Sequence, residues 1–227
     1  MNDRLTIFHG SDKIIEKPYF HGSKKNNDYG YGFYCTENEE VAKEWSVDYL
    51  RSGFCNRYSL NIKDLAILNL NNGQYSVLDW LAILLENREF EARSPLAKEG
   101  KRYILENFNT PYKEADIVIG YRADDSYYSF ASDFINGTIS LRQLSKAMHL
   151  GKLGEQIVLI SKKSYNRISF ESYENTDWRE WYPKKEKRDQ NARKEYYDLD
   201  KNSYIKGDLY MPMIIDREVK QNDPSLF

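Results

Sequence analysis

Several residue patterns that reveal a protein's class are missing from this chain of 227 residues. It contains no unbroken apolar run of the roughly 18 residues that a membrane-spanning helix requires. Its two cysteines, Cys35 and Cys55, are fewer than the four ligands of a structural zinc site, so we expect free thiols and no metal. The N-terminal residues also lack the basic start, apolar stretch and cleavage site of a secretory signal. We therefore expect a cytoplasmic protein with no membrane partner.

The chain has little net charge. Lysine and arginine number 33 and aspartate and glutamate 35, which gives a net charge of −2. Such a balance supplies no global field to recruit nucleic acid, although a local patch could still do so. Hydrophobic residues make up 41 % and charged residues 30 %, which is typical of one globular domain. Aromatic residues are abundant at 15 %, mostly tyrosine, and offer stacking surfaces.

The familiar catalytic motifs are absent as well. There is no Gly-x-Ser-x-Gly elbow, no Gly-x-x-x-x-Gly-Lys-Ser/Thr loop and no His-Glu-x-x-His. A nucleophile at Cys35 would need a histidine, and only His9, His21 and His149 exist, so cysteine catalysis is disfavoured. The Gly-x-Gly at residues 30–32 lacks the third glycine and the preceding apolar strand of a dinucleotide-binding fingerprint.

Hydrophobic periodicity predicts an α+β protein. Thr36 with Glu39 and Ser140 with Gln143 are capping boxes, and Ser76 caps another apolar helix. The expected helices cover residues 36–50, 76–85, 126–136 and 140–148, and the expected strands cover residues 4–8, 58–62, 65–70, 116–120, 156–160 and 165–170. Strands and helices mix without regular βαβ alternation, which is typical of the α+β class.

The composition changes after residue 175, so we divide the chain into a domain at residues 1–175 and a helical extension at residues 176–227. Pro183 suits the first turn of a mostly exposed helix in this extension. The basic stretch 184–194 is interpreted as a solvated helix face, or as a docking surface for a protein or RNA. Interleaved acids dilute its field, so we favour a protein over nucleic acid as partner.

The order of several short motifs is more specific than any one of them. Along the chain these are His9-Gly10-Ser11, Asp28 to Thr36 (Asp-Tyr-Gly-Tyr-Gly-Phe-Tyr-Cys-Thr), Ala42 with Trp45, Asp116 with Gly120, Ala123 to Asp125, and a late strand with Gln156. This order resembles an uncharacterised bacterial family of the ADP-ribosyltransferase clan, of the His-Tyr-Glu kind that includes diphtheria toxin and poly(ADP-ribose) polymerase catalytic domains. The resemblance covers essentially the whole chain.

The resemblance implies two split antiparallel β-sheets with flanking helices and a cleft for NAD between them. It implies NAD-dependent transfer of single ADP-ribose units to a macromolecular acceptor. The catalytic residues would be His9, Tyr34 and one of Glu155 and Gln156, and the NAD-binding residues His9, Gly10, Ser11, Asp28, Gly32, Phe33, Tyr34 and Thr36. In this scheme His9 bonds ribose hydroxyls, Gly10 lets the backbone approach the nicotinamide amide, and Tyr34 stacks on its ring.

The third catalytic position departs from the familiar transferases, which place a glutamate there. Here the late strand offers Glu155 followed by Gln156, and strand alternation points them to opposite faces. The resemblance favours Gln156 in the cleft, whereas electrostatics favours Glu155, because an oxocarbenium-like centre benefits from negative charge. With Gln156 we expect slow transfer and no chain building.

Other interpretations stay open. His9-Gly10-Ser11 could be a plain turn, the aromatic loop could be core packing, and Asp124 and Asp125 are ordinary helix-capping residues. With water as acceptor the protein would be an NAD glycohydrolase, and without catalysis a module that binds a nucleotide or a partner. By analogy the setting would be an effector or the toxin of a toxin–antitoxin system, with an antitoxin or inhibitor protein as further partner.

Overall fold

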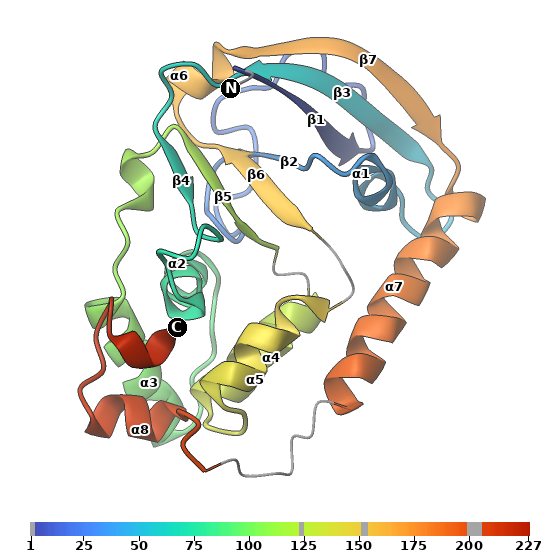
Figure 1. The fold of residues 1–227 in the computed structure, drawn as a ribbon. Helices are drawn as coiled ribbons and strands as arrows, with labels where there is room; N and C mark the ends of the chain where they lie inside the picture. Colours follow the sequence, from blue (N-terminus) through green and yellow to red (C-terminus); the bar gives the residue numbers. More distant parts are fainter. Residues whose placement is uncertain (1–2, 123–124, 151–153, 199–205) are drawn as a thin grey trace.

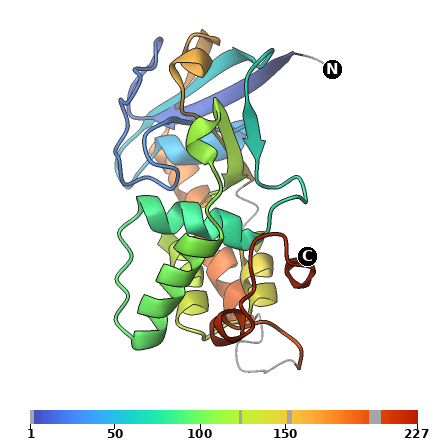
Figure 2. The same cartoon turned by 90° about the vertical axis from the view of Figure 1, so that its left-hand side faces the viewer.

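The computed structural model describes residues 3–122, 125–150, 154–198 and 206–227. These residues form two β-sheets at one end of the molecule and a group of helices at the other (Figure 1). Figure 2, turned by 90°, shows the same division, with the sheets above the helices. Among the described residues, no helix combines the length and the apolar character needed to cross a bilayer.

The first sheet is antiparallel throughout. It contains β1 (Arg4–Ser11), β3 (Gly53–Asn61) and β7 (Ile168–Thr176) in the order β1-β3-β7. Apolar residues alternate along β3, so one face of the sheet is buried. His9 lies inside β1, paired with Asn56, because β1 continues through the glycine and serine that we expected to form a turn.

The second sheet is mixed. It contains β2 (Phe33–Cys35), β6 (Glu155–Leu159), β5 (Ile117–Tyr121) and β4 (Ile67–Asn69) in the order β2-β6-β5-β4. Pairs β2–β6 and β6–β5 are antiparallel, whereas β4 and β5 are parallel. The long helical connection between β4 and β5 returns the chain in its original direction, as a parallel pair requires. The α+β class is confirmed, with this parallel pair as an addition to the expected antiparallel arrangement.

The helices predicted from serine caps begin where we expected, whereas two other helices begin at residues other than those predicted. They are α1 (Glu39–Ser46), α2 (Val77–Asn87), α3 (Pro95–Asn107), α4 (Asp125–Ile135), α5 (Leu141–Ala147), α6 (Lys162–Tyr165), α7 (Trp178–Asp198) and α8 (Met211–Asp216), with 3-10 turns at Tyr112–Glu114 and Pro224–Leu226. Ser76 and Ser140 cap α2 and α5 with complete capping boxes, as predicted. The cap expected for α4 from residues 123–126 falls partly outside the described residues.

The predicted start and end of α1 are both wrong. Asn38 is the cap, and its side-chain oxygen accepts the Val41 N–H at 3.2 Å. Thr36 instead exchanges two backbone hydrogen bonds with Phe8, at 2.8 and 3.0 Å, which join the two sheets. The helix stops at Ser46, short of residue 50, because the chain turns back through paired backbone bonds between residues 48 and 51.

The position of Pro183 was also predicted wrongly. It lies inside α7 rather than in the first turn, because Asp177 starts the helix by accepting the Arg179 N–H at 2.9 Å. The strand expected at residues 165–170 begins later as well. Ser161 caps the short helix α6 first, and the strand β7 follows it.

The core has two main parts, one on each side of the second sheet. Ile157 and Leu159 of β6 join Ile7 and Tyr58 in an apolar cluster between the sheets. Val158, which points the other way, joins a larger cluster formed with the helices. The second sheet therefore lies between the first sheet and the helices. In the C-terminal segment, Tyr196 of α7 and Met211 of α8 are buried in the same helical cluster.

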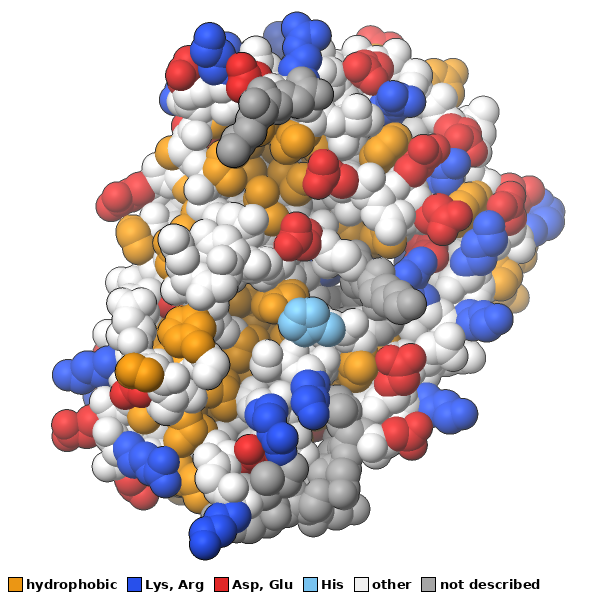
Figure 3. Space-filling model, in the orientation of Figure 1, with side chains coloured by type: hydrophobic (Ala, Val, Ile, Leu, Met, Phe, Trp, Pro, Cys, Tyr) orange, Lys and Arg blue, Asp and Glu red, His pale blue; other side chains and the backbone are white. Residues whose placement is uncertain are grey.

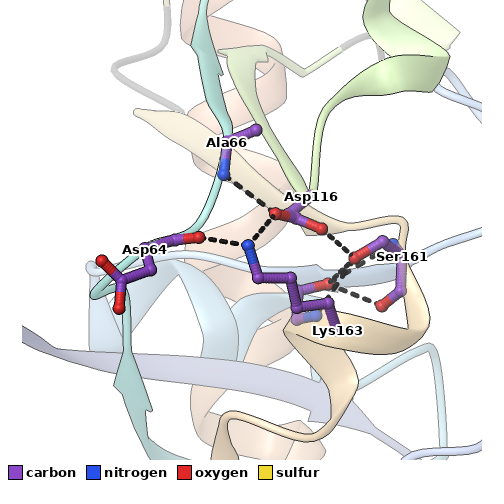
Figure 4. Close-up of polar contacts among 6 residues, drawn as sticks. Asp64, Ala66, Asp116, Ser161 and Lys163 are labelled. Carbon is purple, nitrogen blue, oxygen red and sulfur yellow. Dashed lines mark hydrogen bonds and ion pairs between the residues drawn. The ribbon is translucent and has the colours of Figure 1, made fainter.

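Asp116 ties β4, β5 and α6 together (Figure 4). Its carboxylate accepts the Ala66 N–H at 2.9 Å and the Ser161 hydroxyl at 2.5 Å, and it pairs with Lys163 at 3.3 Å. Burial alone would raise the pKa of Asp116, but the hydrogen bonds and Lys163 outweigh it and lower that pKa. The aspartate of the Asp116–Gly120 motif thus has a structural role in this fold.

We predict that Asp116→Asn lowers the free energy of unfolding at pH 7 by about 1–3 kcal/mol, because a neutral amide replaces a buried charged acceptor that serves three donors. The loss should shrink in acid. The folded pKa lies below the ordinary 3.8, so the stabilisation is present above pH 3.8 and disappears as the pH falls through the folded value. Urea denaturation at pH 7 and pH 3 measures both effects. Asp64→Asn keeps the backbone carbonyl that Lys163 contacts and is the control; equal stability of Asp116→Asn and the control at pH 7 would contradict the prediction.

Candidate functional site

A cavity of about 1460 Å³ opens where β1, β2 and β6 meet α1 and α7. It exceeds the range of roughly 300–1,000 Å³ that drug-sized ligands occupy, so a dinucleotide has room. Seven of the predicted site residues line it: His9, Gly10, Asp28, Gly32, Phe33, Tyr34 and Gln156. Ser11, Thr36 and Glu155 are not part of the lining.

His9 is held in one orientation and one tautomer. Its Nδ1 lies 2.6 Å from the Tyr34 carbonyl oxygen, which can only accept, so Nδ1 carries the hydrogen. The ring packs on Phe33, with centroids 4.4 Å apart. Burial lowers the pKa of His9, although the bond to Tyr34 opposes this. The imidazole is therefore neutral at pH 7, and Nε2 is an acceptor suited to a hydroxyl of a ligand.

The hydroxyl of Tyr34 is committed to its own loop. It donates to the Gly30 carbonyl at 2.7 Å and accepts the Tyr29 N–H at 3.1 Å. Gly30 has φ +73°, a left-handed conformation that glycine adopts without strain. Burial raises the pKa of Tyr34, so the hydroxyl stays protonated and does not serve as a base. The aromatic ring is thus the part of Tyr34 that a ligand can use, as the stacking role requires.

The sequence interpretation missed Asn56, whose side chain holds the segment that follows β1 through several hydrogen bonds. Its Nδ2 donates to the carbonyls of His9 and Lys13 and to the Ser11 hydroxyl, at 3.1–3.2 Å. Its Oδ1 accepts the Ile15 N–H at 3.0 Å, and the side chain is fully buried. The hydroxyl of Ser11 therefore takes part in fixing the backbone that follows β1 beside the cavity. An asparagine inside an apolar strand was a signal that could have revealed this, since strands are poor in asparagine.

Gln156 and Glu155 lie on opposite sides of β6. Gln156 is 5 % exposed, lines the cavity and pairs with Gly120 of β5. Its Oε1 is buried, and no hydrogen-bond donor reaches it among the described residues. Glu155 is exposed and accepts a hydrogen bond from Asn71 at 2.8 Å. Of the two alternatives, the structure thus brings Gln156 to the cavity, with an acceptor oxygen left for a ligand donor.

Two buried carboxylates in the cavity lining are each held by an arginine. Asp28 contacts Arg88 at 3.3 Å. Glu44 of α1 accepts two hydrogen bonds from Arg188 of α7, at 2.7 and 2.8 Å. The bidentate pair fixes α7 against α1 and makes the C-terminal segment one wall of the cavity. The sequence analysis did not single out Glu44 or Arg188, because their pairing joins residues 144 positions apart.

The residues of the rejected alternatives lie elsewhere. Cys35 and Cys55 are free and buried, as expected. Burial raises the pKa of Cys35 well above its usual value and that of Cys55 to about 12, so neither is a thiolate nucleophile at neutral pH. His21 is stacked between Phe20 and Tyr31, with centroids 3.9 and 4.8 Å away, and does not line the cavity.

Comparison with known proteins gives one match to report. The model of a family described as "Protein of unknown function (DUF3990)" matches residues 5–170. This range includes β1, β2, α1 and β6, together with the segment between β1 and β2 that contributes many of the lining residues, and it ends before α7. No curated protein and no solved structure matches the chain.

We predict that Asn56→Ala lowers the free energy of unfolding by about 2–3 kcal/mol, because several groups around it lose buried hydrogen bonds. The amide of Ile15 should also exchange its hydrogen faster, since its acceptor is gone. Chemical denaturation and hydrogen-exchange mass spectrometry measure the two effects. Asn72→Ala, in an exposed turn where the side chain bonds only to Gln74, should change stability by less than about 0.5 kcal/mol. Unchanged exchange at Ile15 would refute the role of Asn56.

Proposed function

This chain belongs to the DUF3990 family of proteins of unknown function, and we propose that it is an NAD-dependent mono-ADP-ribosyltransferase. The observation that carries the proposal is the convergence of His9, Tyr34 and Gln156 on one cavity. These residues come from three separate strands and occupy the three motif positions of the ADP-ribosyltransferases that the sequence resembles. We infer that the two packed sheets are the split sheets of that fold.

The donor and acceptor pattern of the cavity suits a nicotinamide riboside unit. Nε2 of His9 and Oε1 of Gln156 are two acceptors, and a ribose offers hydroxyl donors for both. The Tyr34 ring, in the lining of the same cavity, offers a face for the planar nicotinamide, a contact worth about 1 kcal/mol beyond its burial. Because His9 and Tyr34 are fixed by bonds within the protein and Gln156 is buried on a paired strand, little ordering is needed when the ligand binds.

In the proposed reaction, the bond between nicotinamide nitrogen and ribose C1′ breaks, and nicotinamide leaves with the electron pair. The acceptor nucleophile then bonds to C1′ and releases its proton. Hydrogen bonds from the ribose hydroxyls to His9 and Gln156 hold the sugar while positive charge develops on it. Gln156 contributes little field to that charge, and the nearby carboxylates of Asp28 and Glu44 are paired with arginines. We therefore expect slow transfer of single units.

For the acceptor we propose a protein in preference to nucleic acid. Acidic and basic side chains are interspersed over the face shown in Figure 3, and the chain's net charge is −2. A surface of this kind provides no extended positive field to attract a phosphate backbone.

The proposal is tested with NAD labelled either in nicotinamide or in adenine. Wild-type protein should release nicotinamide and label proteins of a bacterial lysate. His9→Ala and Gln156→Ala should each lose at least about tenfold in rate, which corresponds to about 1.4 kcal/mol of transition-state stabilisation. Gln156→Glu should keep or raise the rate, because it adds charge opposite the oxocarbenium-like centre. Glu155→Ala, on the other side of β6, is the matched control and should keep most of the activity.

Each other outcome has a distinct meaning. Nicotinamide release without labelled acceptor would identify an NAD glycohydrolase. NAD binding without release would identify a non-catalytic binding module. A dead Glu155→Ala with an active Gln156→Ala would contradict the assigned register, and the absence of both binding and release would overturn the proposal.

A further inference from the structure

Within the described part of the chain, a second buried polar atom of the cavity lining has no hydrogen-bond partner. Nε1 of Trp45, on α1, is buried and finds no acceptor among the described residues. Trp80, by contrast, donates its Nε1 hydrogen to the Tyr121 carbonyl at 3.1 Å, as buried indoles usually do. An unmade hydrogen bond at a buried N–H is unfavourable, so this N–H calls for an acceptor from outside the described residues.

The side chain of Arg122 lies next to this indole. Its guanidinium carbon is 4.4 Å from the centre of the Trp45 ring, and both side chains line the cavity. Arg122 follows directly on β5, so the contact joins the end of the second sheet to α1. A guanidinium carries five N–H donors and no acceptor. It therefore cannot satisfy the indole, and it adds positive charge at the same place.

Two acids of this region, Glu44 on α1 and Asp48 just after the helix, are bound by other cations. Glu44 is held by Arg188, and Asp48 by Arg51 at 3.0 Å and Lys185 at 3.9 Å. An acceptor that satisfies the indole lies beside the Arg122 guanidinium, and this positive charge favours an acceptor with negative charge.

We propose that Trp45 and Arg122 form a phosphate-binding subsite of the cavity. Phosphate oxygens accept hydrogen bonds and also carry negative charge. A backbone carbonyl or a neutral hydroxyl accepts hydrogen bonds but carries no net charge. The inference rests on the proposed function for the identity of the ligand, which would be NAD bound through its pyrophosphate. The backbone of Gly10 lies directly against α1 between Ala42 and Ser46, so this subsite is next to the end of β1 that carries His9. A dinucleotide can therefore reach from one subsite to the other.

Calorimetric titration with inorganic pyrophosphate, ADP-ribose and nicotinamide riboside tests the subsite. Arg122→Gln should weaken pyrophosphate and ADP-ribose binding at least about tenfold, because a charged hydrogen-bond partner is lost. Trp45→Phe keeps an aromatic ring and removes the pyrrole ring with its N–H, and should weaken both about fivefold. Nicotinamide riboside, which has no phosphate, should bind all proteins equally. Arg93→Gln, an exposed arginine paired with Glu91 outside the cavity, is the control and should bind like wild type.

The outcomes separate the subsite from the proposed activity. Pyrophosphate binding that depends on Trp45 and Arg122, in a protein that releases no nicotinamide, would support the subsite and reject the activity. NAD turnover with unchanged ADP-ribose binding in both variants would reject the subsite alone. Wild-type protein that binds neither pyrophosphate nor ADP-ribose would also overturn it. If Arg122→Gln fails to fold, Trp45→Phe alone decides.

Discussion

The cavity depends on one close backbone contact, where α1 lies on two glycines of the first sheet. A Cβ atom at Gly10 would sit 1.9 Å from the Ala42 carbonyl oxygen, and one at Gly53 would sit 2.1 Å from that of Ser46. No side chain fits at either position, because backbone atoms cannot move away as a flexible side chain can. The helix therefore reaches the sheet itself, and Trp45 comes to lie beside the strand that carries His9. We expected Gly10 to give a ligand access to the backbone; its closest neighbour is the helix.

The polar groups of the site share one arrangement, in which one end is fixed by the protein and the other end is left for a ligand. His9 uses Nδ1 on the Tyr34 carbonyl and keeps Nε2. Gln156 is held in a paired strand, and neither its Oε1 nor the indole N–H of Trp45 in the same cavity finds a hydrogen-bond partner in the part of the chain that the structure describes. Two acceptors and one donor are thus presented with little freedom. The unmade hydrogen bonds of these groups are unfavourable, and a complementary ligand that makes them gains that free energy on binding.

Local signals in the sequence predicted much of the fold. Ser76 and Ser140 are caps because a serine side chain satisfies N–H groups within its own helix turn, so nothing distant decides the outcome. The prediction for the start of α1 failed because Asn38 and Thr36 are both suitable capping residues. The backbone bonds that hold Thr36 to Phe8 between the two sheets cannot be inferred from local sequence. Helix α3 was not predicted, and the parallel pairing of β4 with β5 depends on how that helical connection folds back. For the site, the motifs named the cavity residues of β1, β2 and β6. Asn56 and the Glu44–Arg188 pair escaped because their partners are distant in the chain.

The helix α7 gives this architecture an exchangeable wall. The family match ends at residue 170, whereas Arg188 of α7 borders the cavity and forms a bidentate pair with Glu44. The strands that hold His9, Tyr34 and Gln156 contain no residue of α7. In their sheets, the strand that leads directly into α7 is β7, the last strand of the first sheet. Replacing the residues after β7 would alter the width and charge of the opening while leaving the three strand positions untouched. The residues that shape the opening of the cavity and the residues on the three strands can therefore diverge independently, because they belong to separate stretches of one chain.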